Sequence, residues 1–160
     1  MRPLLPPLSY LLFFASLIHT GPAWGNQPPD IVVYLADDLS YRDVSIYSDR
    51  GVPTPGLEAL AADGMTFDLA FVASPSCAPS RAALLTGLMP ARNGAEENHS
   101  QPKSDVGRLP RLLGQLGYQV AAFGKVAHSN SAKDYGFEVI DAPKDLPKLR
   151  ERVESFLRER

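Results

Sequence analysis

Short apolar runs alternate along this chain with segments that carry helix start and stop signals. The first run, 30–36, reads Asp-Ile-Val-Val-Tyr-Leu-Ala and follows two prolines. Near-continuous apolar runs of this length are typical of strands that are buried on both faces of a sheet. Because the order is strand, helix, strand, helix, strand, we predict an α/β fold with a mainly parallel sheet and flanking helices. The strands are predicted over 30–36, 65–71 and 118–123, with a further short one over 137–140.

The helix signals between these runs are distinct. Thr54 before Pro55 predicts a helix start, and Gly64 predicts its end. Apolar residues recur at helical spacing near the end of the chain, with charges on the opposite face. The other helices are predicted over 80–86, 110–116 and 145–160, and the polar, aperiodic span 92–107 is predicted to be a surface loop.

The first 25 residues have the pattern of a signal peptide. Arg2 is followed by a short apolar core over 10–18, and Ala23-Trp24-Gly25 places small residues at the exit, so cleavage is expected before Asn26. The alternative is a membrane anchor, but a spanning helix needs about 20 apolar residues. We therefore predict an exported chain with no stable membrane anchor, periplasmic or extracellular in a bacterium and lysosomal or secreted in a eukaryote.

The charge and the cysteine content argue against nucleic-acid binding and against a disulfide within the chain. A net charge of −2 and a pI near 5.9 give no basic surface for nucleic acid. The single cysteine cannot form a disulfide within the chain.

Chemically reactive residues follow three of the predicted strands. Asp37-Asp38 comes after the first, Cys77 after the second, and Lys125 with His128 after the third. Ligands collect at the carboxyl ends of strands in open parallel sheets. Adjacent carboxylates repel unless a positive group lies beside them, and a hard divalent cation meets that need. A solvated turn or a helix cap also explains the Asp-Asp pair.

The segment Cys77-Ala78-Pro79-Ser80-Arg81 combines a thiol at a predicted helix N-terminus with an arginine one turn later. Free N–H groups and the helix dipole favour negative charge there, and a guanidinium can point back at an anion. A bare cysteine at such a place is otherwise a small buried apolar residue or a thiol activated by the dipole.

Cys-x-Pro-Ser-Arg, followed by a small-residue helix and Thr-Gly, resembles the signature of the sulfatase family. Asp37-Asp38 and Gly124-Lys125, in order on either side, extend the resemblance over essentially all of 26–160. It implies an alkaline-phosphatase-like sulfatase core, of which 26–160 would be the N-terminal portion, incomplete at the C-terminus. The remaining metal and substrate residues would then lie beyond residue 160.

The resemblance also implies a chemistry. Cys77 would be oxidised to formylglycine by a maturation enzyme, and its hydrate would attack sulfur. Asp37 and Asp38 would bind Ca²⁺ together with the oxygen at position 77. Arg81 would orient the hydrate and balance its charge, and Lys125 would hold the sulfate. His128 would contact the hydrate or handle the proton.

Two features of the sequence are similar to two different branches of the sulfatase family, so the substrate is only partly specified. The spacing Lys125-x-x-His128 is similar to the iduronate-2-sulfatase branch, whereas Leu85-Thr86-Gly87-Leu88 and the ending 153–157 are similar to the heparan N-sulfatase branch. Both imply a sulfated carbohydrate such as a glycosaminoglycan, as an O-sulfate or an N-sulfate. A phosphonate or phosphate monoester hydrolase of the same superfamily, or an inactive truncated sulfatase, are the alternatives. His99 receives no role from the sequence.

Overall fold

The computed structural model describes residues 28–128 and 131–159, and the predicted signal peptide and its cleavage site lie outside them. The chain divides into two compact units, one ending at Tyr34 and the other running from Leu35 to the end. Within the first unit, residues 28–34 contain neither helix nor strand. The elements of the second unit are η1 (Tyr41–Asp43), α2 (Pro55–Asp63), α3 (Cys77–Thr86), α4 (Pro90–Asn93), α5 (Leu109–Gln115), β1 (Ala121–Phe123), α6 (Ala132–Tyr135), β2 (Val139–Asp141) and α7 (Leu146–Arg158).

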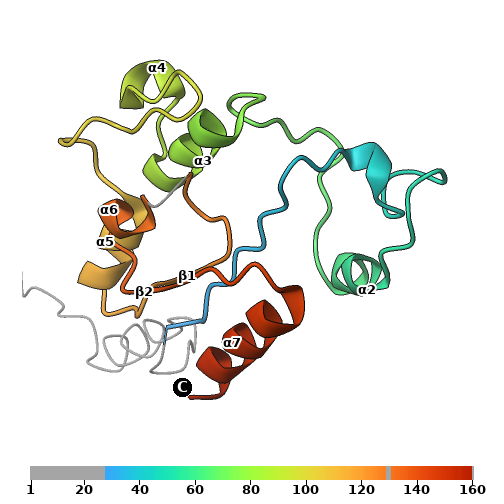
Figure 1. Ribbon diagram of the computed structural model, residues 1–160. Coiled ribbons are helices and arrows are strands. Elements are labelled where there is room, and N and C mark those ends of the chain that lie inside the picture. Colours follow the sequence, from blue (N-terminus) through green and yellow to red (C-terminus); the bar gives the residue numbers. More distant parts are fainter. Residues whose placement is uncertain (1–27, 129–130, 160) are drawn as a thin grey trace, which may run out of the picture. The chain divides into compact units, whose positions relative to one another are not determined.

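The sheet of the second unit has two described strands, and they are parallel. β1 and β2 pair with Ala121 opposite Val139 and Phe123 opposite Asp141. Parallel strands need a crossover connection, and α6 lies in the one between them (Figure 1). A parallel sheet with helices around it confirms the predicted α/β class.

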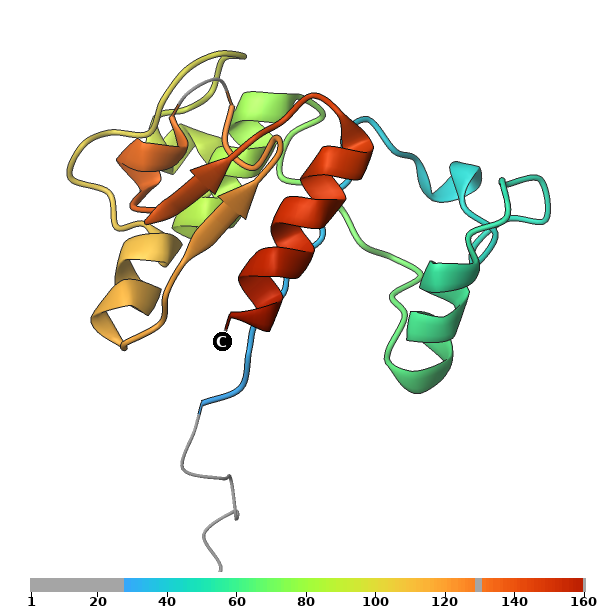
Figure 2. The same ribbon diagram turned by 60° about the horizontal axis from the view of Figure 1, so that its bottom comes forward.

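The core of this unit forms where α3, β1 and α6 meet. Leu85, Ala122 and Tyr135 are among its buried residues, and the half-buried Phe137 packs against them. Ala82 of α3 is also buried, at only 1% exposed. α7 lies beside the strands, where the rings of Phe123 and Phe156 meet edge to face with centroids 5.4 Å apart (Figure 2).

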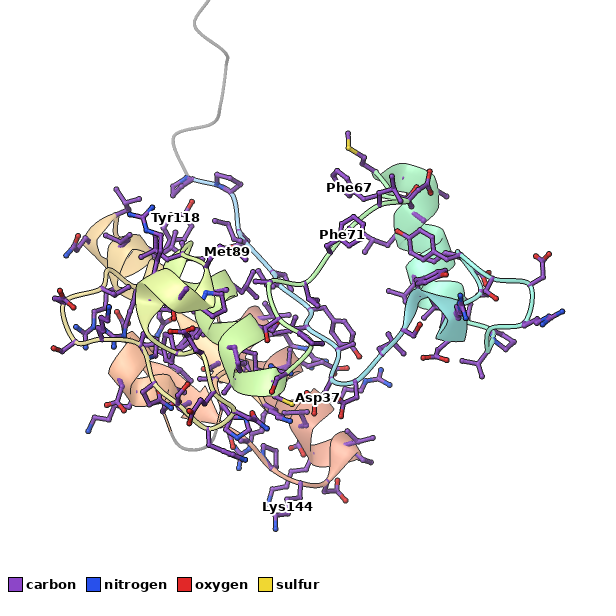
Figure 3. All side chains as sticks on the ribbon, turned by 90° about the horizontal axis from the view of Figure 1, so that it is seen from above. Asp37, Phe67, Phe71, Met89, Tyr118 and Lys144 are labelled. Carbon is purple, nitrogen blue, oxygen red and sulfur yellow. The ribbon has the colours of Figure 1, made fainter. Side chains whose placement is uncertain are left out.

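Two of the predicted strands are wrong. The run over 30–36 has no strand pairing in the structure, and neither has 65–71. A β-branched or alternating run supplies strand propensity, but a strand also needs a hydrogen-bonded neighbour. Neither run has one among the described residues, and the side chains of Phe67 and Phe71 are 64% and 87% exposed (Figure 3).

The predicted surface loop over 92–107 is partly wrong. Its first residues belong to α4, and Asn93 and Ala95 are fully buried. The amide of Asn93 donates to the carbonyl of Leu88 at 3.0 Å, and its Oδ1 accepts from the N–H of Ala95 at 2.7 Å. A polar residue can therefore be internal here because its hydrogen bonds are satisfied. Within the described residues, no helix is both long and apolar enough to cross a membrane.

Candidate functional site

Cys77 is the first residue of α3, as the sequence predicted. Ser76 is the N-cap, in an extended conformation, and its side chain makes no capping hydrogen bond. The helix ends at Gly87, which has a φ of 68° and donates its N–H to the carbonyl of Ala83 at 2.8 Å. The Cys77 thiol is free and half-buried. It therefore lies at a helix N-terminus, where backbone N–H groups favour negative charge.

Arg81 lies one turn into α3 and points into the protein. Its side chain is only 5% exposed. Nη2 donates to Oδ1 of Asp37 at 3.0 Å, and Nη1 donates to the backbone carbonyls of Lys125 and, at 3.1 Å, Val126. One guanidinium thus joins three segments that are far apart in sequence, as its planar fork of donors allows.

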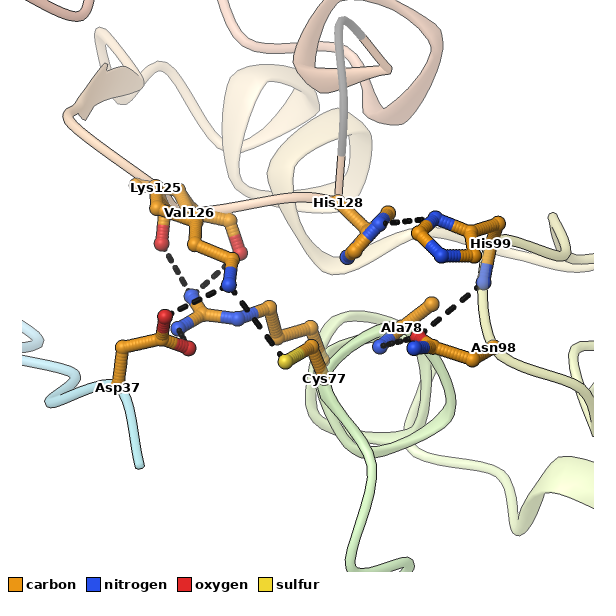
Figure 4. A network of polar contacts seen from close by, with 9 residues as sticks. Asp37, Cys77, Ala78, Asn98, His99, Lys125, Val126 and His128 are labelled. Atoms are coloured by element: carbon orange, nitrogen blue, oxygen red, sulfur yellow. Dashed lines mark hydrogen bonds and ion pairs between the residues drawn. The ribbon is translucent and has the colours of Figure 1, made fainter. Parts of the chain in front are cut away.

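Lys125 reaches the same carboxylate from the turn after β1 (Figure 4). Its Nζ lies 2.6 Å from Oδ2 of Asp37 and 3.5 Å from Sγ of Cys77. Gly124 makes this turn possible, because its φ of 72° is in the left-handed region that favours glycine. The lysine ammonium is therefore held between the acid and the thiol.

The contacts at this carboxylate shift the pKa of Asp37 and of Lys125. The hydrogen bond from Lys125, and after it the one from Arg81, lowers the pKa of the Asp37 carboxyl below its usual value. The same hydrogen bond to Asp37 raises the pKa of Lys125. Both groups thus stay charged through the neutral range.

Asp38 completes a group of potential metal ligands. One ligand atom from each of Asp37, Asp38 and Cys77 lies within 4.8 Å of the others. Asp38 has a φ of 52°, an uncommon conformation for a residue other than glycine. Two carboxylates suit a hard cation such as Ca²⁺, which takes about 6–8 oxygen ligands. A thiol is a soft ligand, so the set fits Ca²⁺ when position 77 carries oxygen.

Like Asp38, His128 is a predicted site residue that no described hydrogen bond joins to Asp37, Cys77, Arg81 or Lys125. Its Nε2 lies 2.6 Å from Nδ1 of His99, a residue to which no motif in the sequence assigns a role. Its Nδ1 is buried and has no hydrogen-bond partner among the residues that the structure describes. Burial, more than any neighbouring charge, lowers the pKa of His128.

Asn98 was also missed by the sequence analysis. Its Oδ1 accepts from the backbone N–H of Ala78, at 3.4 Å, and of His99, at 3.2 Å. Asn98 lies in a polar loop, 20 residues after Ala78. No spacing rule links the two segments, so the sequence does not indicate that this loop returns to α3.

Comparisons with known proteins show what this chain is similar to. The family model described as Sulfatase matches residues 29–157. An ulvan-active sulfatase from Formosa agariphila is 42% identical over 100 residues, which cover 62% of this chain and 20% of the relative. An N-acetylgalactosamine-6-sulfatase from Canis lupus familiaris is 40% identical over 128 residues, which cover 72% of this chain and 24% of the relative.

A solved structure shares the fold. The structure titled "Crystal structure of Ps i-CgsB" aligns with a TM-score of 0.63 and 27% sequence identity, over 81% of this chain and 33% of that one. The chain spans about a fifth to a quarter of the length of the curated relatives it matches.

Proposed function

The chain belongs to the sulfatase family, and from this premise we propose that the complete gene product hydrolyses sulfate esters of carbohydrates at the site around Cys77. One observation carries the proposal. Lys125 and the buried Arg81, from separate segments, meet on Asp37, and the lysine also contacts the sulfur of Cys77. A sulfatase needs this combination of a nucleophile position, fixed cations and carboxylates in one place.

Position 77 would supply the nucleophile. When Cys77 is converted to formylglycine by a maturation enzyme, the hydrated aldehyde supplies the attacking oxygen and, by re-forming, the exit for sulfate. The N-terminus of α3 would then favour the negative charge that gathers at this position.

The two cationic side chains have different tasks. Lys125 is 43% exposed and can turn from Asp37 toward an incoming sulfate, whereas Arg81 is buried and fixed by three acceptors. Lys125 would therefore hold the sulfate, and Arg81 would hold Asp37 and balance the charge of the hydrate.

Asp37 and Asp38 would hold Ca²⁺ with the oxygen at position 77. The cation would add fixed positive charge beside the nucleophile, as a Lewis acid does. The further ligands that Ca²⁺ requires would come from other parts of the complete gene product.

His128 would handle a proton. Burial lowers its pKa and keeps the imidazole neutral near pH 7, so that it can act as a base. Its buried Nδ1, which has no partner among the described residues, is the nitrogen available for this exchange.

The substrate class follows from the relatives. The name of the canine relative specifies an amino sugar whose nitrogen is acetylated, with sulfate at position 6, and such a sulfate is carried on oxygen. The Formosa relative is named for ulvan. We therefore favour an O-sulfated carbohydrate over an N-sulfated one as the substrate. We also propose that residues 1–25 are a signal peptide and that the enzyme is exported.

The decisive test is made on the complete gene product from its own host. Mass spectrometry of the peptide that contains Cys77 and Arg81 should show conversion of the thiol to an aldehyde. The same protein should hydrolyse an aryl sulfate faster than an aryl phosphonate, and a chelator should abolish this activity. An unmodified thiol, or a preference for the phosphonate, would reject the proposal.

A further inference from the structure

His99 and His128 form a close ring pair beside the site. The two ring centroids are 4.5 Å apart, and the planes meet at 73°, so one ring approaches the other edge-on. The 2.6 Å contact between Nε2 of His128 and Nδ1 of His99 is a hydrogen bond in which the tautomers decide the donor (Figure 4).

The backbone around His99 is fixed so that this contact can form. His99 has a φ of 70°, an uncommon conformation for a residue other than glycine. Asn98 ties the same segment to the first turn of α3, because its Oδ1 accepts from the N–H of Ala78. Asn98 and His99 together therefore connect Ala78, the residue after Cys77, with the loop that carries His128.

Burial decides between the two arrangements of the protons. If His99 donated, the proton of neutral His128 would lie on Nδ1, as a buried donor with no partner among the described residues. Orphaned buried N–H groups are rare. If His128 donates from Nε2, its Nδ1 is a bare acceptor, and the exposed His99 can turn its own N–H to water.

We propose that His99 is a positioning residue: it accepts the Nε2–H of His128 and thereby fixes the ring and leaves the lone pair on Nδ1 for proton transfer. This inference rests on the proposed function for its catalytic consequence only. Hydrogen bonds to one ring nitrogen set the role of the other in this way. Lys125, Arg81 and His99 also disfavour a charged His128, and Asp37 opposes them.

Two variants of His99 separate the effect of losing the hydrogen-bond acceptor from the effect of changing the backbone conformation. Both glycine and asparagine tolerate a positive φ, but only asparagine keeps an acceptor, its Oδ1, near the place of Nδ1. In the complete gene product, His99→Gly should lower kcat on an aryl sulfate about tenfold to hundredfold with KM nearly unchanged. His99→Asn should restore most of the loss.

A second measurement does not depend on turnover. Long-range ¹H–¹⁵N spectra of the imidazoles should show His128 as the Nε2–H tautomer in the wild type and in His99→Asn. The signal is assigned by its loss in His128→Gln. In His99→Gly the tautomer should become mixed.

Ser100→Ala is the matched control, since it removes a hydroxyl that donates to the carbonyl of Glu97 in the same turn without altering either ring. It also removes Asn98-His99-Ser100, a triplet with the N-glycosylation pattern. It should leave kcat and the His128 spectrum unchanged. A wild-type kcat and an unchanged tautomer in His99→Gly would overturn the inference, and so would a loss that His99→Asn does not restore. Absence of sulfatase activity in the wild type would instead reject the proposed function, while the spectra would still decide the tautomer.

Discussion

Replacing Asp37 with asparagine removes the negative charge on which Arg81 and Lys125 meet. The variant keeps the side-chain volume and one acceptor, and Arg81 keeps its two backbone carbonyls. Removing one partner of a fully buried ion pair costs about 3–5 kcal/mol, whereas an exposed pair is worth about 0–1 kcal/mol. The side chains are 5% exposed for Arg81 and 39% for Asp37. We therefore expect Asp37→Asn to lower the free energy of unfolding by about 1–3 kcal/mol at neutral pH, between these limits.

The pH dependence of this loss tests its electrostatic origin. The folded-state pKa of Asp37 is depressed, so its contribution is present above the unfolded-state pKa and is lost as pH falls through the folded-state pKa. Urea denaturation of both proteins in steps from neutral to strongly acidic pH should show the difference shrinking only below the usual range of aspartate.

Asp38→Asn is the control for the Asp37 variant. Asp38 makes no ion pair with any residue that the structure describes, and asparagine accepts its φ of 52° equally well. It should leave unfolding nearly unchanged. An equal loss in the two variants, or a loss for Asp37→Asn that persists at the most acidic pH, would refute the ion-pair explanation.

Two further substitutions test the turn after β1. Gly124→Ala should destabilise the fold by about 1–2 kcal/mol because an alanine is strained at this positive φ. Thermal unfolding should show a lowered Tm for this variant. Gly107→Ala is the control and should leave Tm unchanged, since a Cβ at Gly107 meets open space. Lys125→Gln should raise the pKa of Asp37 toward its usual range, since the hydrogen bond from Lys125 is the largest cause of the lowered pKa, and Lys125→Arg should keep it low. ¹³C titration of the Asp37 carboxyl measures this pKa in each variant. An unchanged titration midpoint in Lys125→Gln would contradict the contact.

Local signals in the sequence predicted the four longer helices, α2, α3, α5 and α7, but not the short helices η1, α4 and α6. The small residues of 80–86 and the closing Gly87 gave α3, and the amphipathic pattern over 145–160 gave α7. A helix makes its hydrogen bonds within one segment, so its signals lie there as well. Strands do not share this property, which is why 30–36 and 65–71 carried the right residues and formed no pairs among the described residues.

The same distinction applies to the site. Asp37, Cys77, Arg81 and Lys125 could be nominated because each belongs to a motif with recognisable chemistry, and the structure brings all four together. Asn98 and His99 belong to a polar loop without a pattern of its own. Their contacts with Ala78 and His128 depend on the path of that loop in space, which no residue spacing specifies.

The two adjacent aspartates differ in how their negative charge is balanced. Both oxygens of Asp37 accept from cationic side chains, one from α3 and one from the turn after β1. Much of its charge is therefore already balanced, whereas Asp38 has no such partner among the described residues. For a divalent cation bound here, Asp38 would supply most of the unbalanced negative charge, and Asp37 would mainly fix the position of the cation. Asp37 would then link the cation to Arg81 and Lys125, so that one carboxylate would set the distance between the metal and the lysine that we propose holds the sulfate.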